Sequence, residues 1–183
     1  LKEAYARRDE LAQYGLRSDT CVHSFDTLVP AKKYFKDHPE FFSLIGGERK
    51  GEAAQRCLAN GEFRRTFAEE LSGWMEKVPH AATYGVCPND GYGWCECADC
   101  RALDTAEDRR NGTVNGRMAA FVKELCARFP DRTIGNYSYS NFRDFYKLYG
   151  KMPANLMLST TVSHCQGHPL AAKACPRNAK VWA

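Results

Sequence analysis

Short apolar segments alternate with longer amphipathic segments along this chain, and the alternation restricts the folds that it can adopt. One amphipathic segment begins at Asn60 and ends at Pro79, and a second begins at Val114 and ends at Pro130. In both, apolar residues recur three and four positions apart, which predicts helices with one buried face. Strands are predicted at residues 19–25, 55–59, 82–87, 133–138 and 156–160. Strands that alternate with such helices form βαβ units, so we expect an α/β fold with a parallel sheet.

Polar and aromatic side chains follow the ends of these strands, whereas the helix starts carry no comparable groups. They are His23, Asn89, Asp90, Tyr137, Tyr139, His164 and His168. Ligands of parallel sheets bind at the carboxyl ends of the strands, so the pattern favours a (β/α) barrel with parallel strands inside and amphipathic helices outside. A complete barrel takes about 250 residues. We therefore expect residues 1–183 to form a single domain, a partial TIM-like barrel that is a fragment of a (β/α)8 barrel.

Three further segments lie outside this alternation. A weak apolar face predicts a helix over residues 1–14. Residues 27–53 form a long connection with four aromatic residues and a Gly46–Gly47 turn, and we expect short helical turns within it. Residues 104–112 form a polar segment before the second amphipathic helix.

The composition is that of a globular domain with one core, with 44% hydrophobic and 26% charged residues. The net charge is +4, and basic and acidic residues are interspersed, so no nucleic-acid partner is expected. The chain has no apolar run of 18 residues and no recognisable signal peptide, so no membrane span is expected. Because it begins with Leu1 rather than Met, we expect it to be a piece of a longer protein.

The segment at residues 84–100, YGVCPNDGYGWCECADC, carries the densest group of chemically useful side chains. Pro88 and the glycines that follow cannot continue a strand or a helix, so the backbone turns directly after a buried strand. The turn places Asn89 and Asp90 at the strand's carboxyl end. Asn-Asp-Gly also favours a plain tight turn, which is the alternative to a site here.

Nine cysteines are present, an odd number that does not suggest a simple disulfide framework. Four of them lie in apolar patterns and are expected to be buried small side chains: Cys21, Cys57, Cys87 and Cys126. Cys95, Cys97 and Cys100 have C-x-C-x2-C spacing, which allows three thiolates to converge on a structural zinc ion. The fourth ligand is expected to be Cys87, His164 or Cys165. A disulfide, such as Cys97–Cys100, or three reduced thiols are the alternatives.

Four pieces of the chain together resemble a known family. They are YFKDHPEFFSL at residues 34–44, CLAN at 57–60, PNDGYGWCECADC at 88–100, and the late segment at 164–170. Over residues 23–170 the chain resembles the bacterial domain of unknown function 4838, a glycoside-hydrolase-like TIM barrel similar to family-20 hexosaminidases and family-67 α-glucuronidases. The resemblance implies a secreted or surface protein that processes bacterial-environment or host glycans, with an oligosaccharide or polysaccharide substrate and an extracytoplasmic location.

The resemblance also implies roles for Asn89 and Asp90. Related hydrolases place an acidic catalytic residue after barrel strand four, which Asp90 would follow if one strand precedes Leu1. Asp90 is therefore the candidate general acid, and Asn89 could hold a sugar hydroxyl or acetamido group. Hydrolysis usually needs a second carboxylate, for which Asp26, Glu96, Asp99 or a residue outside this chain are candidates. Substrate-assisted hydrolysis would need none, and no cofactor is required for catalysis.

Aromatic and imidazole side chains supply the candidate sugar contacts. The aromatic candidates are Tyr92, Trp94, Tyr137 and Tyr139, each of which could instead belong to the core. His23 and His168 are candidates to hydrogen-bond sugar hydroxyls, or else are simply solvated. The main alternative function is a non-catalytic carbohydrate-binding barrel with a structural metal-thiolate loop. A metal-dependent enzyme built on the thiols ranks last, because the chain lacks the usual helical pair of histidines.

Overall fold

The structure is a computed structural model that describes residues 10, 13–14, 19–20 and 22–160 of the chain. Its centre is a four-stranded parallel sheet in the order β1-β4-β5-β6. The strands are β1 (Asp19–Thr20), β4 (Thr83–Gly85), β5 (Ile134–Ser138) and β6 (Leu156–Thr160). The expected α/β class and parallel pairing are confirmed. The described sheet is open, with β1 and β6 at its edges, so it does not form a closed barrel.

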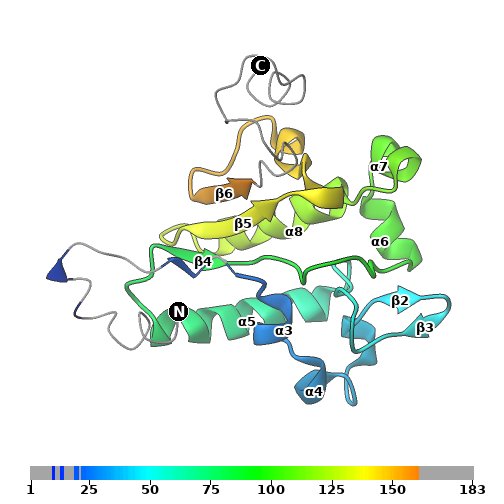
Figure 1. Cartoon of the computed structure of the whole chain (residues 1–183), viewed down its shortest axis with the longest axis horizontal. Helices are drawn as coiled ribbons and strands as arrows, with labels where there is room; N and C mark the ends of the chain where they lie inside the picture. The colour runs from blue at the N-terminus through cyan, green and yellow to red at the C-terminus, as the bar shows by residue number, and fades with distance from the viewer. Residues whose placement is uncertain (1–9, 11–12, 15–18, 21, 161–183) are drawn as a thin grey trace, which may run out of the picture.

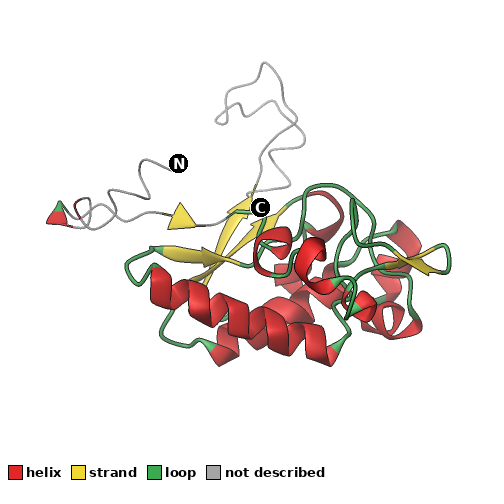
Figure 2. Ribbon diagram, turned by 90° about the horizontal axis from the view of Figure 1, so that it is seen from below, coloured by secondary structure: helices red, strands yellow, loops and turns green. Residues whose placement is uncertain are grey.

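Two long helices connect these strands, as their periodicity predicts. Along the chain, helix α5 (Gly61–Lys77) comes between β1 and β4, and helix α8 (Asn115–Arg128) comes between β4 and β5. Asn60 caps α5 by accepting a hydrogen bond from the backbone amide of Phe63 at 2.7 Å. Both helices lie beneath the strands in Figure 2, and β5 runs along α8 in Figure 1.

The core lies between the sheet and the two long helices, α5 and α8. Tyr84, Ile134 and Leu156 are paired in register across three strands and belong to the same buried cluster as the apolar faces of α5 and α8. An edge-to-face group of phenylalanine rings joins the two helices to the segment after β1, and it comprises Phe25, Phe63, Phe67 and Phe121. Both long helices therefore cover the same face of the sheet.

The long connection between β1 and α5 contains the short turns that the sequence predicts. They are α3 (Phe25–Leu28), α4 (Ala31–Tyr34) and the 3-10 helix η1 (Pro39–Phe41). A hairpin of β2 (Leu44–Ile45) and β3 (Glu48–Arg49), whose strands the sequence does not predict, flanks the predicted Gly46–Gly47 turn. The predicted strand at residues 55–59 is wrong. Only an isolated bridge joins Phe42 to Arg56 there. The fully buried Arg56 donates to the backbone oxygens of Val29 and Ala54, so its side chain secures this segment in place of a strand ladder.

The segment between β4 and α8 is more helical than the sequence predicts. It contains α6 (Ala98–Leu103) and α7 (Ala106–Asn111). Cys97 caps α6, and a capping box between Thr105 and Asp108 begins α7 inside the polar segment at residues 104–112, for which no helix was predicted. Two 3-10 helices, η2 (Ser140–Phe142) and η3 (Phe145–Tyr149), connect β5 to β6.

Several predictions lie outside the described residues: most of the helix at residues 1–14, Cys21, and the segment with His164, Cys165 and His168. Among the helices of the described part, none is long and apolar enough to cross a membrane.

Candidate functional site

A pocket of about 280 Å³ lies beyond the carboxyl ends of the strands. Its walls come from three segments that are distant in sequence: the start of α3, the stretch before α5 and the turn after β4. The lining residues are His23, Asp26, Ala53, Ala54, Gln55, Asn89, Asp90 and Tyr92. The structure therefore brings together five of the candidates named from the sequence, which are His23, Asp26, Asn89, Asp90 and Tyr92.

Asn89 joins the three segments. Its Nδ2 donates to the backbone oxygen of Ala54 at 3.1 Å, and its Oδ1 accepts from the backbone amide of Asp26 at 3.1 Å. Gln55 completes the connection through the backbone of Asn89. Its Oε1 accepts a hydrogen bond from the backbone N–H of Asn89 at 2.9 Å, and its Nε2 donates to the backbone oxygen of Asn89 at 2.8 Å. Both polar atoms of the Asn89 side chain are thus bonded to backbone, which suits a residue that shapes the pocket.

Asp90 is exposed, and its carboxylate is hydrogen-bonded by Tyr139, the residue that follows β5. Its Oδ1 accepts a hydrogen bond from the hydroxyl of Tyr139 at 2.9 Å. Burial and this hydrogen bond raise the pKa of Tyr139, so the phenol keeps its hydrogen and remains a donor at neutral pH. The carboxylate is therefore oriented at the pocket while remaining open to solvent.

His23 approaches the same turn from the segment after β1. Its Nδ1 lies within hydrogen-bonding distance of the backbone oxygen of Pro88, and its ring lies 5.2 Å from that of Tyr137. Because a carbonyl oxygen can only accept, Nδ1 carries the hydrogen. In the neutral form of the ring, the Nε2 atom is then left as an acceptor.

The aromatic candidates separate into two groups. Tyr92 lines the pocket and is 73% exposed. Trp94 does not line it: the ring is half-buried, packs against the main core and makes an edge contact with Phe142 at 5.9 Å. Tyr137 and Tyr139 contact each other at 6.0 Å and lie behind His23 and Asp90. Of the four, Tyr92 is the one whose ring is available at the pocket surface.

Asp26 lines the pocket together with Asp90, unlike the other two carboxylate candidates, Glu96 and Asp99. Glu96 instead accepts from the backbone amide of Gly46 in the β2–β3 hairpin at 2.9 Å. Asp26 is 64% exposed at its side chain and pairs with the fully buried guanidinium of Arg56 at 2.5 Å. Burial lowers the pKa of Arg56 and the pairing with Asp26 partly offsets this.

Sequence reasoning missed Gln55 and Arg56, although two polar residues within an apolar segment were the available signal.

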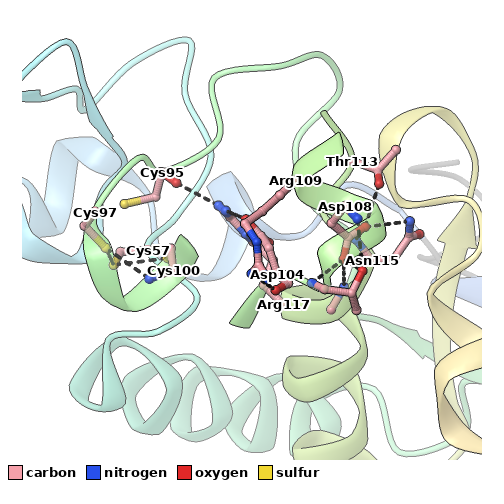
Figure 3. Close-up of polar contacts among 12 residues, drawn as sticks. Cys57, Cys95, Cys97, Cys100, Asp104, Asp108, Arg109, Thr113, Asn115 and Arg117 are labelled. Atoms are coloured by element: carbon pink, nitrogen blue, oxygen red, sulfur yellow. Dashed lines mark hydrogen bonds and ion pairs between the residues drawn. The ribbon is translucent and has the colours of Figure 1, made fainter. Parts of the chain in front are cut away.

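Four cysteines form a second cluster, which Figure 3 shows between the segment before α5 and the start of α6. Cys57, Cys95, Cys97 and Cys100 have sulfur atoms within 4.8 Å of one another. The convergence of the three predicted thiols is confirmed. The fourth member is Cys57, which is buried as predicted but is not merely a small core side chain. Of the three expected fourth ligands, Cys87 is not part of the cluster, and His164 and Cys165 lie outside the described residues. Cys87 lies two residues beyond β4, where it makes an isolated bridge with His23, and its sulfur lies 3.8 Å from the backbone oxygen of Gly135.

All six described cysteines are free thiols, so the predicted alternative of a Cys97–Cys100 disulfide is absent. Hydrogen bonding with Cys57 and Cys95, together with burial, raises the pKa of Cys100, whereas hydrogen bonds from Cys100 and Cys57 lower the pKa of Cys95. The thiols of Cys57, Cys95 and Cys100 therefore affect one another's ionisation. Three buried thiols and the partly buried Cys97 have the donors and the proximity to hold a metal ion.

Comparison with known families places the chain. A model of the family described as "Domain of unknown function (DUF4838)" matches residues 3–180. The chain belongs to the DUF4838 family. Neither a curated protein nor a solved structure matches it. The DUF4838 match covers both the pocket and the four-cysteine cluster, so both belong to the family's domain.

Proposed function

We propose that this DUF4838 domain acts on glycans as a glycoside hydrolase, with Asp90 as its general acid. The observation that supports it is that Asp26 and Asp90 line one pocket beyond the carboxyl ends of a parallel sheet. Most glycoside hydrolases use two carboxyl groups that flank the bond to be cleaved. No cofactor is needed for this chemistry, and the substrate would be an oligosaccharide or a polysaccharide.

The strand order supports the related proposal of a partial TIM-like barrel. The four strands follow one another in space as they do in the chain, and both long helices cover one face. A doubly wound sheet would reverse its order and place helices on both faces. Strands beyond the described ones would complete a barrel similar to those of the family-20 hexosaminidases and family-67 α-glucuronidases.

The contacts around the two carboxyl groups suggest a division of work. Asp90, which faces solvent, would protonate the leaving oxygen, and Tyr139 would keep its carboxyl group oriented. Asp26, which is fixed by Arg56, would serve as the second carboxyl group. His23 could accept a hydrogen bond from a sugar hydroxyl at Nε2, while the exposed ring of Tyr92 could stack on a sugar face.

The test is Asp90→Asn in the complete protein, assayed against a panel of oligosaccharides and aryl glycosides. Loss of a general acid should reduce the rate by about 100-fold or more. The matched control is Asp99→Asn, an exposed carboxylate at the start of α6 that does not line the pocket. Equal activity of the Asp90→Asn variant and the wild-type protein would refute the proposal.

A non-catalytic carbohydrate-binding domain is the second candidate, and it is favoured by the exposure of Tyr92 on the pocket wall. A sugar ring can stack on an exposed tyrosine ring without any catalytic acid. In that case Tyr92→Ala would weaken glycan binding measured by calorimetry, no product would form from any glycan, and Asp90→Asn would bind as the wild-type protein does.

A further inference from the structure

We propose that Cys57, Cys95, Cys97 and Cys100 bind one zinc ion in a closed structural site, which fastens two walls of the pocket to each other. The inference is independent of what the pocket binds or cleaves. It rests on the positions of the four sulfurs, on the groups that surround them and on the segments that carry them.

The spacing of the sulfurs matches a tetrahedral metal site. Four sulfurs at about 2.3 Å from a central zinc ion lie about 3.8 Å from one another. The sulfur of Cys57 lies 3.7 Å from those of both Cys97 and Cys100, and all four lie within 4.8 Å of one another. The sulfurs of a disulfide would be about 2.05 Å apart. The arrangement therefore leaves space for one ion rather than a bond.

Backbone amides and a cation face the sulfurs as they would face thiolates. The Leu44 amide donates to the sulfur of Cys95 at 3.3 Å, and the Cys100 amide donates to that of Cys97 at 3.4 Å. The guanidinium of Arg49 lies 3.8 Å from the Cys95 sulfur. Four thiolates and a zinc ion carry a net charge of −2, so these donors and this positive charge stabilise the loaded site.

A second arginine fixes the backbone of the cluster. Arg117 on α8 donates to the backbone oxygen of Cys95 at 2.7 Å and pairs with Asp104, and both side chains are buried (Figure 3). The cluster thus has a rigid support from α8 before any metal binds. Preorganised ligands need little rearrangement on binding, which favours a stable structural site.

The cluster is too small to be a hydrophobic core in its own right. Cys57, Cys95 and Cys100 are at most 4% exposed, yet they form a group separate from the main core. Their partly buried neighbours are Leu44, Ala59 and Cys97. A metal ion would supply the cohesion that so few apolar side chains cannot.

All four ligands are thiols, which selects zinc or iron among the common metals. With four protein ligands the coordination sphere is closed, so the ion would have no open position for substrate. Its role would be mechanical. Cys57 follows Gln55 by two residues, and Cys95 follows Tyr92 by three, so the ion would link the pocket wall at residues 53–55 to the wall at residues 89–92.

Metal content decides the proposal. The full chain, purified without chelator or a metal-affinity tag, is expected to contain about one equivalent of zinc by elemental analysis. Replacement by Co²⁺ should give the strong sulfur-to-cobalt charge-transfer absorption and the visible bands of a tetrahedral tetrathiolate site. Less than about one-tenth equivalent of zinc or iron, together with a failure to bind Co²⁺, would overturn the proposal; one equivalent of iron would correct the identity of the metal.

The fourth ligand is tested by Cys57→Ser, with Cys126→Ser as a matched control. Cys126 is also a buried free thiol, but it lies on α8 and packs in the main core. Cys57→Ser should bind zinc at least about 100-fold more weakly, whereas Cys126→Ser should keep one equivalent. Unchanged zinc affinity in Cys57→Ser would exclude Cys57 as a ligand.

The Co²⁺ spectrum of the wild-type protein keeps the test valid if Cys57→Ser fails to fold, because its charge-transfer intensity reports the number of thiolate ligands. Limited proteolysis provides a readout of the mechanical role. Removal of zinc by a chelator should accelerate cleavage within residues 88–97. Cleavage at the same rate with and without zinc would refute the link between the two pocket walls.

Discussion

The hydroxyl of Tyr139 donates a hydrogen bond to Asp90 at 2.9 Å, from the end of β5 to the turn after β4. Neighbouring strands of a parallel sheet present their carboxyl ends at one edge, which is why residues 49 positions apart meet here. The Tyr139 ring also contacts Tyr137 and Phe142, so the hydroxyl is held by a packed ring. The contact makes Tyr139 a positioning residue for Asp90.

On the proposed glycoside-hydrolase function, Tyr139→Phe should therefore reduce glycan cleavage while leaving the fold intact. The substitution removes one hydrogen bond to a carboxylate and keeps the ring contacts. A bond of this kind is worth about 1.4 kcal/mol, which corresponds to about a tenfold lower kcat/KM. Steady-state kinetics and a melting temperature on the same preparation measure the two effects.

Tyr149→Phe is the matched control for this experiment. Its hydroxyl donates to the backbone oxygen of Ala119 on α8 at 3.0 Å, so the substitution also removes one hydrogen bond, but from the core. We expect a lower melting temperature and unchanged kcat/KM. If Tyr139→Phe behaves like Tyr149→Phe, the Tyr139 hydroxyl contributes to stability alone.

Arg56 gives a second prediction, because its fully buried guanidinium serves several groups at once. It donates to the backbone oxygens of Val29 and Ala54, pairs with Asp26, and lies 4.3 Å from the ring of Phe42. Arg56→Met would leave buried carbonyls without a donor, so we expect a loss of about 2–4 kcal/mol in the free energy of unfolding. Urea denaturation measures it.

Arg65→Met is the corresponding control on the surface. Arg65 is 61% exposed at its side chain and forms a 3.9 Å ion pair with Glu62 one turn away on α5. Exposed pairs of this kind contribute about 0–1 kcal/mol, so little change is expected. Equal losses for the two variants would show that Arg56 does not secure the pocket wall.

The helices and the later strands were predictable because their signals are local. Asn60 and Pro79 mark the ends of α5 in the sequence, and the observed helix begins and ends within two residues of them. Strands β5 and β6 were predicted within one residue of their observed bounds. Local patterns also placed Asp90 in the turn that follows a strand, and the structure has it in the turn after β4.

The contacts that define the pocket and the cluster were not predictable from spacing. Cys57 and Cys97 are 40 positions apart and are brought together by the path of the chain around α5, which no local pattern encodes. The segment around Arg56 resembled a strand, but its buried guanidinium satisfies the backbone instead of a neighbouring strand. Helix α7 was the exception, because the spacing of Thr105 and Asp108 is a capping-box signal that was available in the sequence.

Two glycines in the long helices provide a third prediction. A Cβ atom on Gly116, near the start of α8, would lie 2.1 Å from the backbone oxygen of Leu103. Because that oxygen belongs to the backbone, α6 and α8 would have to separate. Gly116→Ala should reduce the free energy of unfolding by about 1–3 kcal/mol, as overpacking does, measured by urea denaturation.

Gly73→Ala is the opposite case, in the interior of α5. A Cβ atom there would have no heavy atom within 4 Å. Alanine is the better helix former, so we expect a gain of about 0.5–1 kcal/mol. A gain in both variants would mean that α6 and α8 pack less closely than the structure has them.

Asp108 carries the last prediction, which concerns stability in acid. Its buried carboxylate accepts hydrogen bonds that join α7 to the start of α8 (Figure 3). The donors are Thr105 through its amide and hydroxyl, Thr113 through its hydroxyl, Asn115 through its amide and side chain, and Gly116 through its amide. Burial by itself would raise the pKa of Asp108, but these hydrogen bonds outweigh it and hold the pKa well below its usual range.

A carboxylate whose pKa is depressed in the folded state stabilises the protein above its unfolded pKa of about 3.9. That stability is lost as the pH falls from about 5 through the lower, folded pKa. Asp108→Asn places an amide where six donors expect an acceptor, so it should cost about 2–4 kcal/mol at pH 7. The difference from the wild-type protein should shrink below pH 4.

Urea denaturation from pH 2 to pH 7 measures the loss at pH 7 and its decrease in acid. The control is the exposed Asp131→Asn, whose free energy of unfolding is expected to stay within about 0.5 kcal/mol of the wild-type value at pH 7. A difference for Asp108→Asn that is the same at pH 2 and pH 7 would show that the charge of this carboxylate does not join the two helices.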